Sequence, residues 1–281
     1  MILFPNFDAG LRAAFRREME LFLGNMVSED RSLLDLLQAD YTFMNERLAA
    51  HYGVPDIRGD QYRRVTLKDP NRYGLLGKGA ILLVTSYANR TAPVIRGAWI
   101  LENILGTPPA APPPNVEGFK ENKEGEKALT IREILKEHRA NPSCNSCHGI
   151  MDPLGLSLEN FDAIGAWRTK DKWAGEMIDA TGTLADGTAV ASPKDLREAL
   201  MKRPQQFVQT MTEKMMTYAL GRGLKPYDRR AVDGVQRAVA ADGYRFQTMV
   251  RELVHSLPFQ SRRGEEDRRE EERREKNAGV R

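Results

Sequence analysis

The chain has 281 residues, of which 41% are hydrophobic and 29% charged, and its formal net charge is only +3. A chain of this length buries a sizeable core, as one large domain or as two or three small ones. The small net charge, without a basic stripe of interleaved aromatic residues, argues against a dedicated nucleic-acid-binding protein. No run of about 18 apolar residues is present, so the sequence predicts no transmembrane segment.

The first part of the chain predicts helices and one short strand. Residues 8–27 carry apolar side chains at helical spacing, and Asp8 is a suitable N-cap. Two further short helices are expected at 32–37 and 41–51. Weak alternation at 61–67 indicates a short strand.

A helix is predicted from Pro93 to Gly106. Thr91 is the expected N-cap, and the proline falls in the first turn, where a missing N–H costs nothing. The proline-rich run that follows, 108–114, predicts a stiff polyproline-like spacer, and the charged residues after it predict an exposed loop.

This spacer divides the chain into four predicted regions. They are an N-terminal helical domain at 1–106, a linker at 107–128, a second helical domain at 129–260 and a charged tail at 261–281 that is disordered or a solvated helix.

The second half predicts mostly helices. Residues 131–138 form the first, the chain breaks at Asp152-Pro153, and 157–168 form a short helix and turn. A hairpin or irregular loops are expected within 176–190, with Asp186-Gly187 as the turn of a hairpin. The last four predicted helices are 193–201, 204–221, 229–240 and 244–256.

Both cysteines of the chain lie in one motif, Cys144-Asn-Ser-Cys147-His148. Two thiols at this spacing reach the two vinyl groups on one edge of a porphyrin, and the next residue then falls under the iron as an axial ligand. The motif therefore predicts a covalently bound c-type haem. With the helical pattern, it predicts a mainly α fold of helical domains around that haem, with a few short strands or hairpins.

Other interpretations of the cysteine pair stay open. A zinc site would need a second pair of ligands, and only an oddly spaced set of Cys144, Cys147, His148 and His138 is available. A thioredoxin-like pair would open a helix in a βαβ unit, which the pattern does not show. A simple disulfide would leave His148 as a coincidence. A zinc or disulfide would make the chain a non-catalytic interaction module.

The sixth iron ligand would decide the class of chemistry. A methionine favours electron transfer at high potential, a second histidine lowers the potential, and an open position allows peroxide or oxygen chemistry. Met151 needs a sharp reversal at Asp152-Pro153 to reach the distal face, and otherwise packs against the haem edge. His138 lies on the preceding helix and is the second candidate.

The remaining candidates have weaker signals. Arg168, Arg90 and Arg96 suit haem propionates, with surface ion pairing as the alternative. His51 is expected to carry a favourable positive charge at a helix C-terminus, and His255 is an ordinary histidine. Met211, Met215 and Met216 lie at helical spacing, which favours core packing.

Five stretches resemble multi-domain cytochrome c proteins of planctomycetes, which are strings of domains of unknown function. They are Asp40–Pro55, Gly77–Tyr87, Arg90–Pro109, His138–His148 with Met151–Gly155, and Leu220–Leu224 with Tyr227-Asp228. Together they cover about residues 8–260 and match the C-terminal half of such proteins. The resemblance implies N-terminal domains and an export signal outside this chain.

That implication matters because haem c is attached outside the cytoplasm in bacteria, whereas the N-terminus shows no signal-peptide pattern. We therefore expect an exported, periplasmic protein of which this chain is a piece. The leading function is electron transfer with an unidentified redox partner protein. The alternative is a haem-dependent oxidoreductase of peroxidase or oxidase type.

Overall fold

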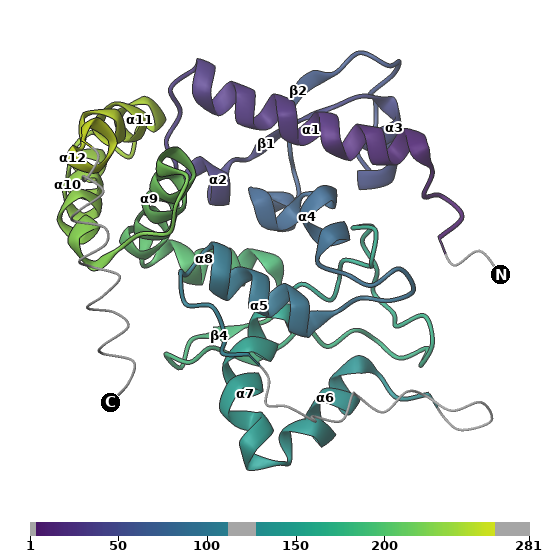
Figure 1. Cartoon of the computed structure of the whole chain (residues 1–281). Helices are drawn as coiled ribbons and strands as arrows, with labels where there is room; N and C mark the ends of the chain where they lie inside the picture. Colours follow the sequence, from purple (N-terminus) through teal and green to yellow (C-terminus); the bar gives the residue numbers. More distant parts are fainter. Residues whose placement is uncertain (1–3, 112–127, 262–281) are drawn as a thin grey trace.

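The computed structural model describes residues 4–111 and 128–261 and is mainly helical, as predicted. Its N-terminal part holds a long first helix over a short two-stranded sheet (Figure 1). These elements are α1 (Ala9–Ser28), α2 (Asp35–Gln38), β1 (Tyr41–Met44), α3 (Glu46–Tyr52), β2 (Arg63–Thr66), the 3-10 turns η1 (Pro70–Arg72) and η2 (Leu75–Gly77), and α4 (Gly79–Val84).

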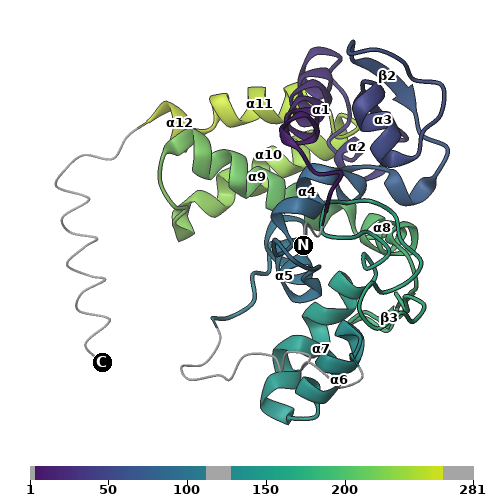
Figure 2. The same cartoon turned by 90° about the vertical axis from the view of Figure 1, so that its right-hand side faces the viewer.

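The rest of the described chain adds the motif-bearing helix pair and a helical group at the other side of the molecule. In both views α6 and α7 lie at the lower end, away from α11 (Figures 1 and 2). The elements are α5 (Pro93–Asn103), α6 (Ile131–Arg139), α7 (Pro142–Leu156), β3 (Gly182–Thr183), β4 (Ala189–Val190), α8 (Pro193–Met201), α9 (Pro204–Leu220), η3 (Pro226–Asp228), α10 (Arg229–Ala241), α11 (Phe246–His255) and α12 (Leu257–Gln260).

Most predicted helices and both predicted β features are confirmed. Asp8 caps α1 by accepting the Leu11 N–H at 2.6 Å, as its position suggested. Ser192 caps α8 by accepting the Asp195 N–H at 3.1 Å. The hairpin β3–β4 turns at Gly187, whose φ of 84° suits a residue without a Cβ.

The predicted helix at 41–51 is wrong in its first four residues. Tyr41–Met44 form β1, which pairs antiparallel with β2, and the helix α3 starts only after Asn45 caps it. The run Tyr-Thr-Phe-Met is aromatic and β-branched, and pairing with a distant strand outweighs the helical pattern that continues from it. The strand predicted at 61–67 is its partner.

Two predictions around the motif helix are also wrong. The chain does not break at Asp152-Pro153, because α7 continues through both residues to Leu156. The short helix predicted within 157–168 is instead a set of turns, closed by the bridge between Phe161 and Trp167.

The helix α7 persists through its proline because it packs very closely against α5. A Cβ at Gly97 of α5 would overlap the Met151 carbonyl oxygen, and a Cβ at Gly155 of α7 would overlap the Pro93 carbonyl oxygen. The earlier residue of α5, Pro93, meets the later residue of α7, Gly155, whereas Gly97 meets Met151. The two helices are therefore antiparallel. An interior proline costs about 3 kcal/mol, and this backbone-to-backbone contact offsets that cost.

One apolar cluster joins both sides of the predicted linker at 107–128. It contains Phe22 of α1, Ile100 of α5, Leu154 of α7 and Phe207 of α9, all nearly inaccessible to water. The described helices before and after the linker thus share a core. The charged tail and most of the linker lie outside the described residues.

We predict that Gly155→Ala destabilises the protein by about 1–3 kcal/mol, because the added methyl group meets backbone atoms that cannot move aside. The control is Gly234→Ala in α10, where nothing lies within 4 Å of the new methyl group. That substitution should stabilise the helix by about 0.5–1 kcal/mol. Urea unfolding followed by circular dichroism measures both, and equal stabilities would contradict the close helix contact.

Candidate functional site

The cysteine motif lies at the start of α7, directly after a tight turn from α6. Thr130 and Glu133 form a capping box that starts α6. Asn141 then caps α7 by accepting the Ser143 N–H at 2.9 Å, and Pro142 occupies the first helical position. Local capping therefore fixes where the motif helix begins.

The two thiols and the imidazole share one face of α7. Cys144, Cys147 and His148 stand at positions i, i+3 and i+4, which are neighbours on a helix surface. Both cysteines are free thiols, Cys144 half-buried and Cys147 exposed. The two sulfurs do not form a disulfide with each other, and the Cys147 side chain is accessible from outside. This arrangement fits the predicted haem attachment.

His148 is held by a carboxylate one turn later on the same helix. Its Nδ1 lies 2.9 Å from Oδ1 of Asp152, whose side chain is fully buried. Burial raises the pKa of Asp152 above its ordinary value, and the hydrogen bond from His148 opposes that rise. The accepting carboxylate orients the ring and places the proton on Nδ1, so Nε2 carries the lone pair that a metal needs.

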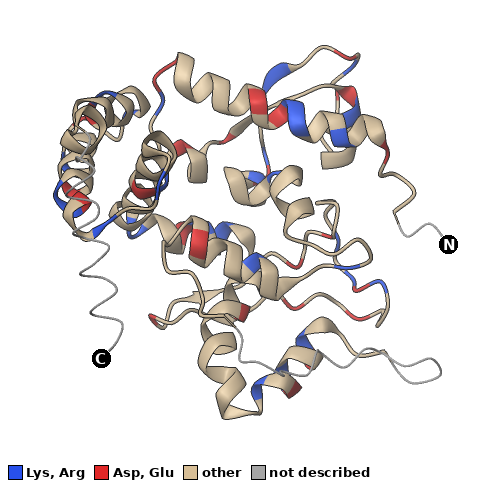
Figure 3. Cartoon of the chain, in the orientation of Figure 1, with Lys and Arg blue, Asp and Glu red and all other residues tan. Residues whose placement is uncertain are grey.

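Asp152 is itself incompletely satisfied. Its Oδ2 is buried without a hydrogen bond, although Nη1 of Arg139 lies 3.5 Å away. At that distance Arg139 and Asp152 form an ion pair but no hydrogen bond. Asp152 is also the only charged residue of α7, and the ribbon of this helix is tan over nearly its whole length (Figure 3).

His138 lies beside His148, as its place on the preceding helix allowed. The two ring centres are 4.6 Å apart with the rings nearly perpendicular. Burial, and then the neighbouring His148, lower the pKa of His138. Two imidazoles on opposite sides of one metal need ring centres roughly 6 Å apart, since each metal–nitrogen bond is about 2 Å. The described rings lie next to each other rather than across a metal.

Met151 points into the core. It belongs to the same face of α7 as the cysteines and is only 6% exposed, packed beside Gly97 of α5. The reversal that distal ligation would need is absent, because the helix continues past Met151. Core packing therefore accounts for this side chain.

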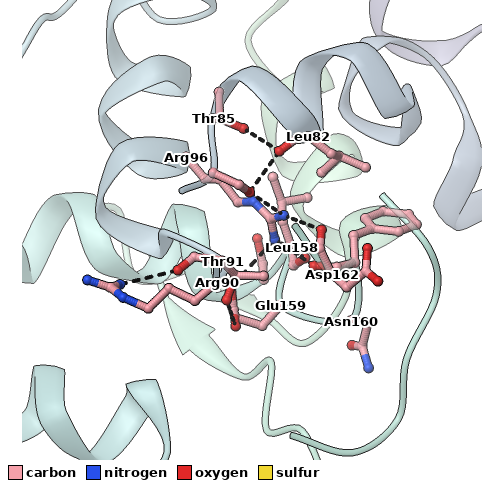
Figure 4. Close-up of polar contacts among 12 residues, drawn as sticks. Leu82, Thr85, Arg90, Thr91, Arg96, Leu158, Glu159, Asn160 and Asp162 are labelled. Carbon is pink, nitrogen blue, oxygen red and sulfur yellow. Dashed lines mark hydrogen bonds and ion pairs between the residues drawn. The ribbon is translucent and has the colours of Figure 1, made fainter. Parts of the chain in front are cut away.

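A buried ion-pair network ties α5 to the turns after α7 (Figure 4). Arg96 is completely buried and donates to the carbonyl oxygens of Leu158, Phe161 and Asp162 at 2.8–2.9 Å. Its Nη1 also lies 3.4 Å from Glu159. Burial lowers the pKa of Arg96 to about 10, so it stays charged at neutral pH. Arg96 is therefore a structural residue, and its candidacy for a propionate is wrong.

Arg168 joins the same network from the outer side. It donates to Glu159 Oε2 at 2.8 Å and to Thr91 Oγ1 at 3.3 Å. Thr91 in turn donates to Glu159 at 2.9 Å, so its predicted role as N-cap of α5 is wrong and Ala92 occupies that position. Arg168 and Arg90 also line a hollow of about 490 Å³ beside Ile131 and Ile134 of α6. The role of Arg168 in haem binding stays a prediction.

The remaining histidine and methionine candidates lie outside this site. His51 is in the last turn of α3, but its Nε2 donates to the Ile164 carbonyl at 2.8 Å, and burial lowers its pKa. Its place at a helix C-terminus is therefore confirmed, whereas burial opposes the positive charge that was expected there. Met216 is fully buried, and Met211 and Met215 pack against apolar clusters, as their spacing indicated.

Within residues 4–111 and 128–261, no group of three or more His, Cys, Asp or Glu side chains is gathered to hold a metal ion. The four-ligand zinc set is therefore not assembled in that part of the chain. No described helix is long and apolar enough to cross a membrane.

Three family models match consecutive stretches of the chain, and all three describe proteins of unknown function. DUF1592 matches residues 2–54, DUF1588 matches 72–171, and DUF1585 matches 186–259. These are the domain types of planctomycete-type multi-domain cytochrome c proteins. The DUF1588 match includes the motif and runs across the predicted linker. No curated protein and no solved structure matches the chain.

Sequence reasoning missed Asp152 and Glu159. His148 and Asp152 stand at i and i+4, a spacing that brings them together on any helix. The signal was hidden because the proline after Asp152 indicated a chain break. No pattern in the sequence identifies Glu159, because two of its partners, Thr91 and Arg96, are more than 60 positions away.

We predict that Arg96→Met destabilises the protein by about 3–5 kcal/mol, because it leaves Glu159 and three carbonyl oxygens buried without their shared partner. Arg64→Met is the control, since its ion pair with Glu29 is exposed, and it should cost less than about 1 kcal/mol. Thermal unfolding of both variants measures this. Similar losses in the two variants would contradict a structural role specific to Arg96.

Proposed function

We propose that the chain binds haem c covalently through Cys144 and Cys147, with His148 as an axial iron ligand. The observation that carries this proposal is the arrangement on α7: two free thiols and an imidazole on one face, with Nδ1 of the imidazole held by a buried carboxylate. A zinc site would need further ligands gathered around the cysteines, and residues 4–111 and 128–261 gather no such group.

Bound haem would supply one-electron chemistry, and the residues of the chain would hold and orient it. Cys144 and Cys147 anchor one edge of the porphyrin through thioether bonds. His148 presents Nε2 to the iron because Asp152 engages Nδ1. The tight contact of α7 with α5 keeps these side chains on a rigid element rather than a loop.

The leading function is electron transfer in an exported, periplasmic protein, and the partner is a redox protein. The three consecutive domain matches support a place in the planctomycete-type multi-domain cytochrome c family, with this chain as the C-terminal half. Export is part of the proposal because haem c is attached outside the bacterial cytoplasm.

We predict that protein made together with a haem c maturation system carries covalent haem, detected by a pyridine haemochrome spectrum of the denatured protein. Cys144→Ala combined with Cys147→Ala should abolish it, because the chain has no other cysteine. Ser146→Ala, between the two cysteines, is the matched control and should retain the haem. Wild-type protein without covalent haem would refute the proposal.

A haem enzyme of peroxidase or oxidase type is the second candidate, and one observation favours it. Met151, the nearest methionine, is committed to the core, and His138 lies beside His148 rather than across from it. The described residues around the motif thus leave the distal position without an evident ligand. An open position is what peroxide or oxygen chemistry requires.

Carbon monoxide separates the two functions. For an electron carrier we expect the visible spectrum of the reduced protein to stay unchanged on adding carbon monoxide, because both axial positions are filled. If His138 moves across to become the sixth ligand, His138→Ala should open the site to carbon monoxide, whereas His255→Ala should not. Ready binding by the wild-type protein would instead assign the site to the enzyme class.

A further inference from the structure

We propose that Asp152 is a positioning residue that keeps the axial imidazole of His148 electron-rich and thereby lowers the reduction potential of the haem. This inference rests on the proposed haem attachment at Cys144 and Cys147. It goes beyond that attachment because it concerns which oxidation state the site favours.

The geometry fits a dedicated acceptor. Asp152 follows His148 by four residues on one helix, so backbone geometry alone brings the carboxylate to the ring, and Oδ1 lies 2.9 Å from Nδ1. The carboxylate is fully buried, whereas the imidazole keeps 15% of its surface exposed. The acceptor is thus shielded from water, and the ring still faces the side from which a ligand comes.

The fold gains little stability from this buried carboxylate. One oxygen lacks a hydrogen bond, and the nearest cation, Arg139, lies 3.5 Å away without hydrogen-bond geometry. Burying a charge that is only partly compensated costs free energy. Such a cost is common where a side chain serves a site rather than the core, which is the role that the contact with His148 suggests.

The charged and titratable groups around Asp152 come from both packed helices. On α7 it meets His148, and from α6 it faces Arg139 and His138, both of which lower the pKa of Asp152. With Nδ1–H donated to the carboxylate, the imidazole gains anionic character, and a more basic ligand stabilises ferric over ferrous iron. A hydrogen bond inside a low-dielectric site has a larger effect than the same bond in water.

Two substitutions with opposite expected signs test the inference. Asp152→Asn keeps the size but removes the charge, so the midpoint potential should shift upward in a potentiometric titration. Arg139→Gln removes the cation beside Oδ2, so the potential should shift downward. Glu137→Gln is the matched control: this carboxylate is exposed on α6, and its loss should leave the potential unchanged.

Resonance Raman spectroscopy measures the iron–histidine stretching frequency, which a change of a distant charge would not alter. The iron–histidine stretching frequency of the reduced protein should fall in Asp152→Asn and stay constant in Glu137→Gln. Equal potentials in Asp152→Asn and wild type, or an upward shift in Arg139→Gln as well, would overturn the inference. Haemochrome content is measured for each variant, so loss of covalent haem is distinguished from a change in potential.

A measurement on the haem-free wild-type protein needs neither a variant nor haem. Nitrogen-15 spectroscopy of the imidazoles should show His148 in the tautomer with its proton on Nδ1, in a hydrogen bond. A proton on Nε2 would overturn the inference while leaving covalent attachment unaffected.

Discussion

The close contact between α5 and α7 is the constraint on which the candidate site depends. Backbone meets backbone at Gly97 and Gly155, so neither helix can rotate or slide without a clash. α7 stays helical through Pro153 while it makes this contact, and His148 and Asp152 lie one turn apart on it.

Buried charges fix the segments around this helix pair. Arg96 of α5 gathers three carbonyl oxygens from the turns after α7, and Glu159 returns from those turns to Thr91 and Arg168. A guanidinium suits this task because its five donors reach several acceptors at once. A similar device joins α1 to the start of α4: Glu18 is buried against Thr42, Tyr52 and Lys78. The first two matched stretches are therefore joined by the buried Glu18–Lys78 ion pair, and the shared apolar cluster includes residues of all three.

Sequence signals within a few residues correctly predicted the elements whose start and end depend on neighbouring residues. Caps at Asp8 and Ser192, the glycine at 187 and the helical spacing after Pro204 were sufficient for most elements. The failures share one cause, which is a partner far away in the chain. Residues 41–44 pair with 63–66, Thr91 donates a hydrogen bond to Glu159, and α7 packs against α5. No window of sequence contains both members of any of these pairs.

In the candidate site, too, some features follow from neighbouring residues and others from distant parts of the chain. The shared face of Cys144, Cys147 and His148 follows from their spacing once a helix is assumed, whereas the burial of Met151 and Asp152 depends on packing against other helices. Both consequences of that burial act in the same direction, toward a lower haem potential. Burying Met151 removes the nearest ligand that raises a haem potential, and burying Asp152 strengthens the hydrogen bond that lowers one. The packing around α7 therefore acts on the reduction potential of the proposed haem as well as on its position.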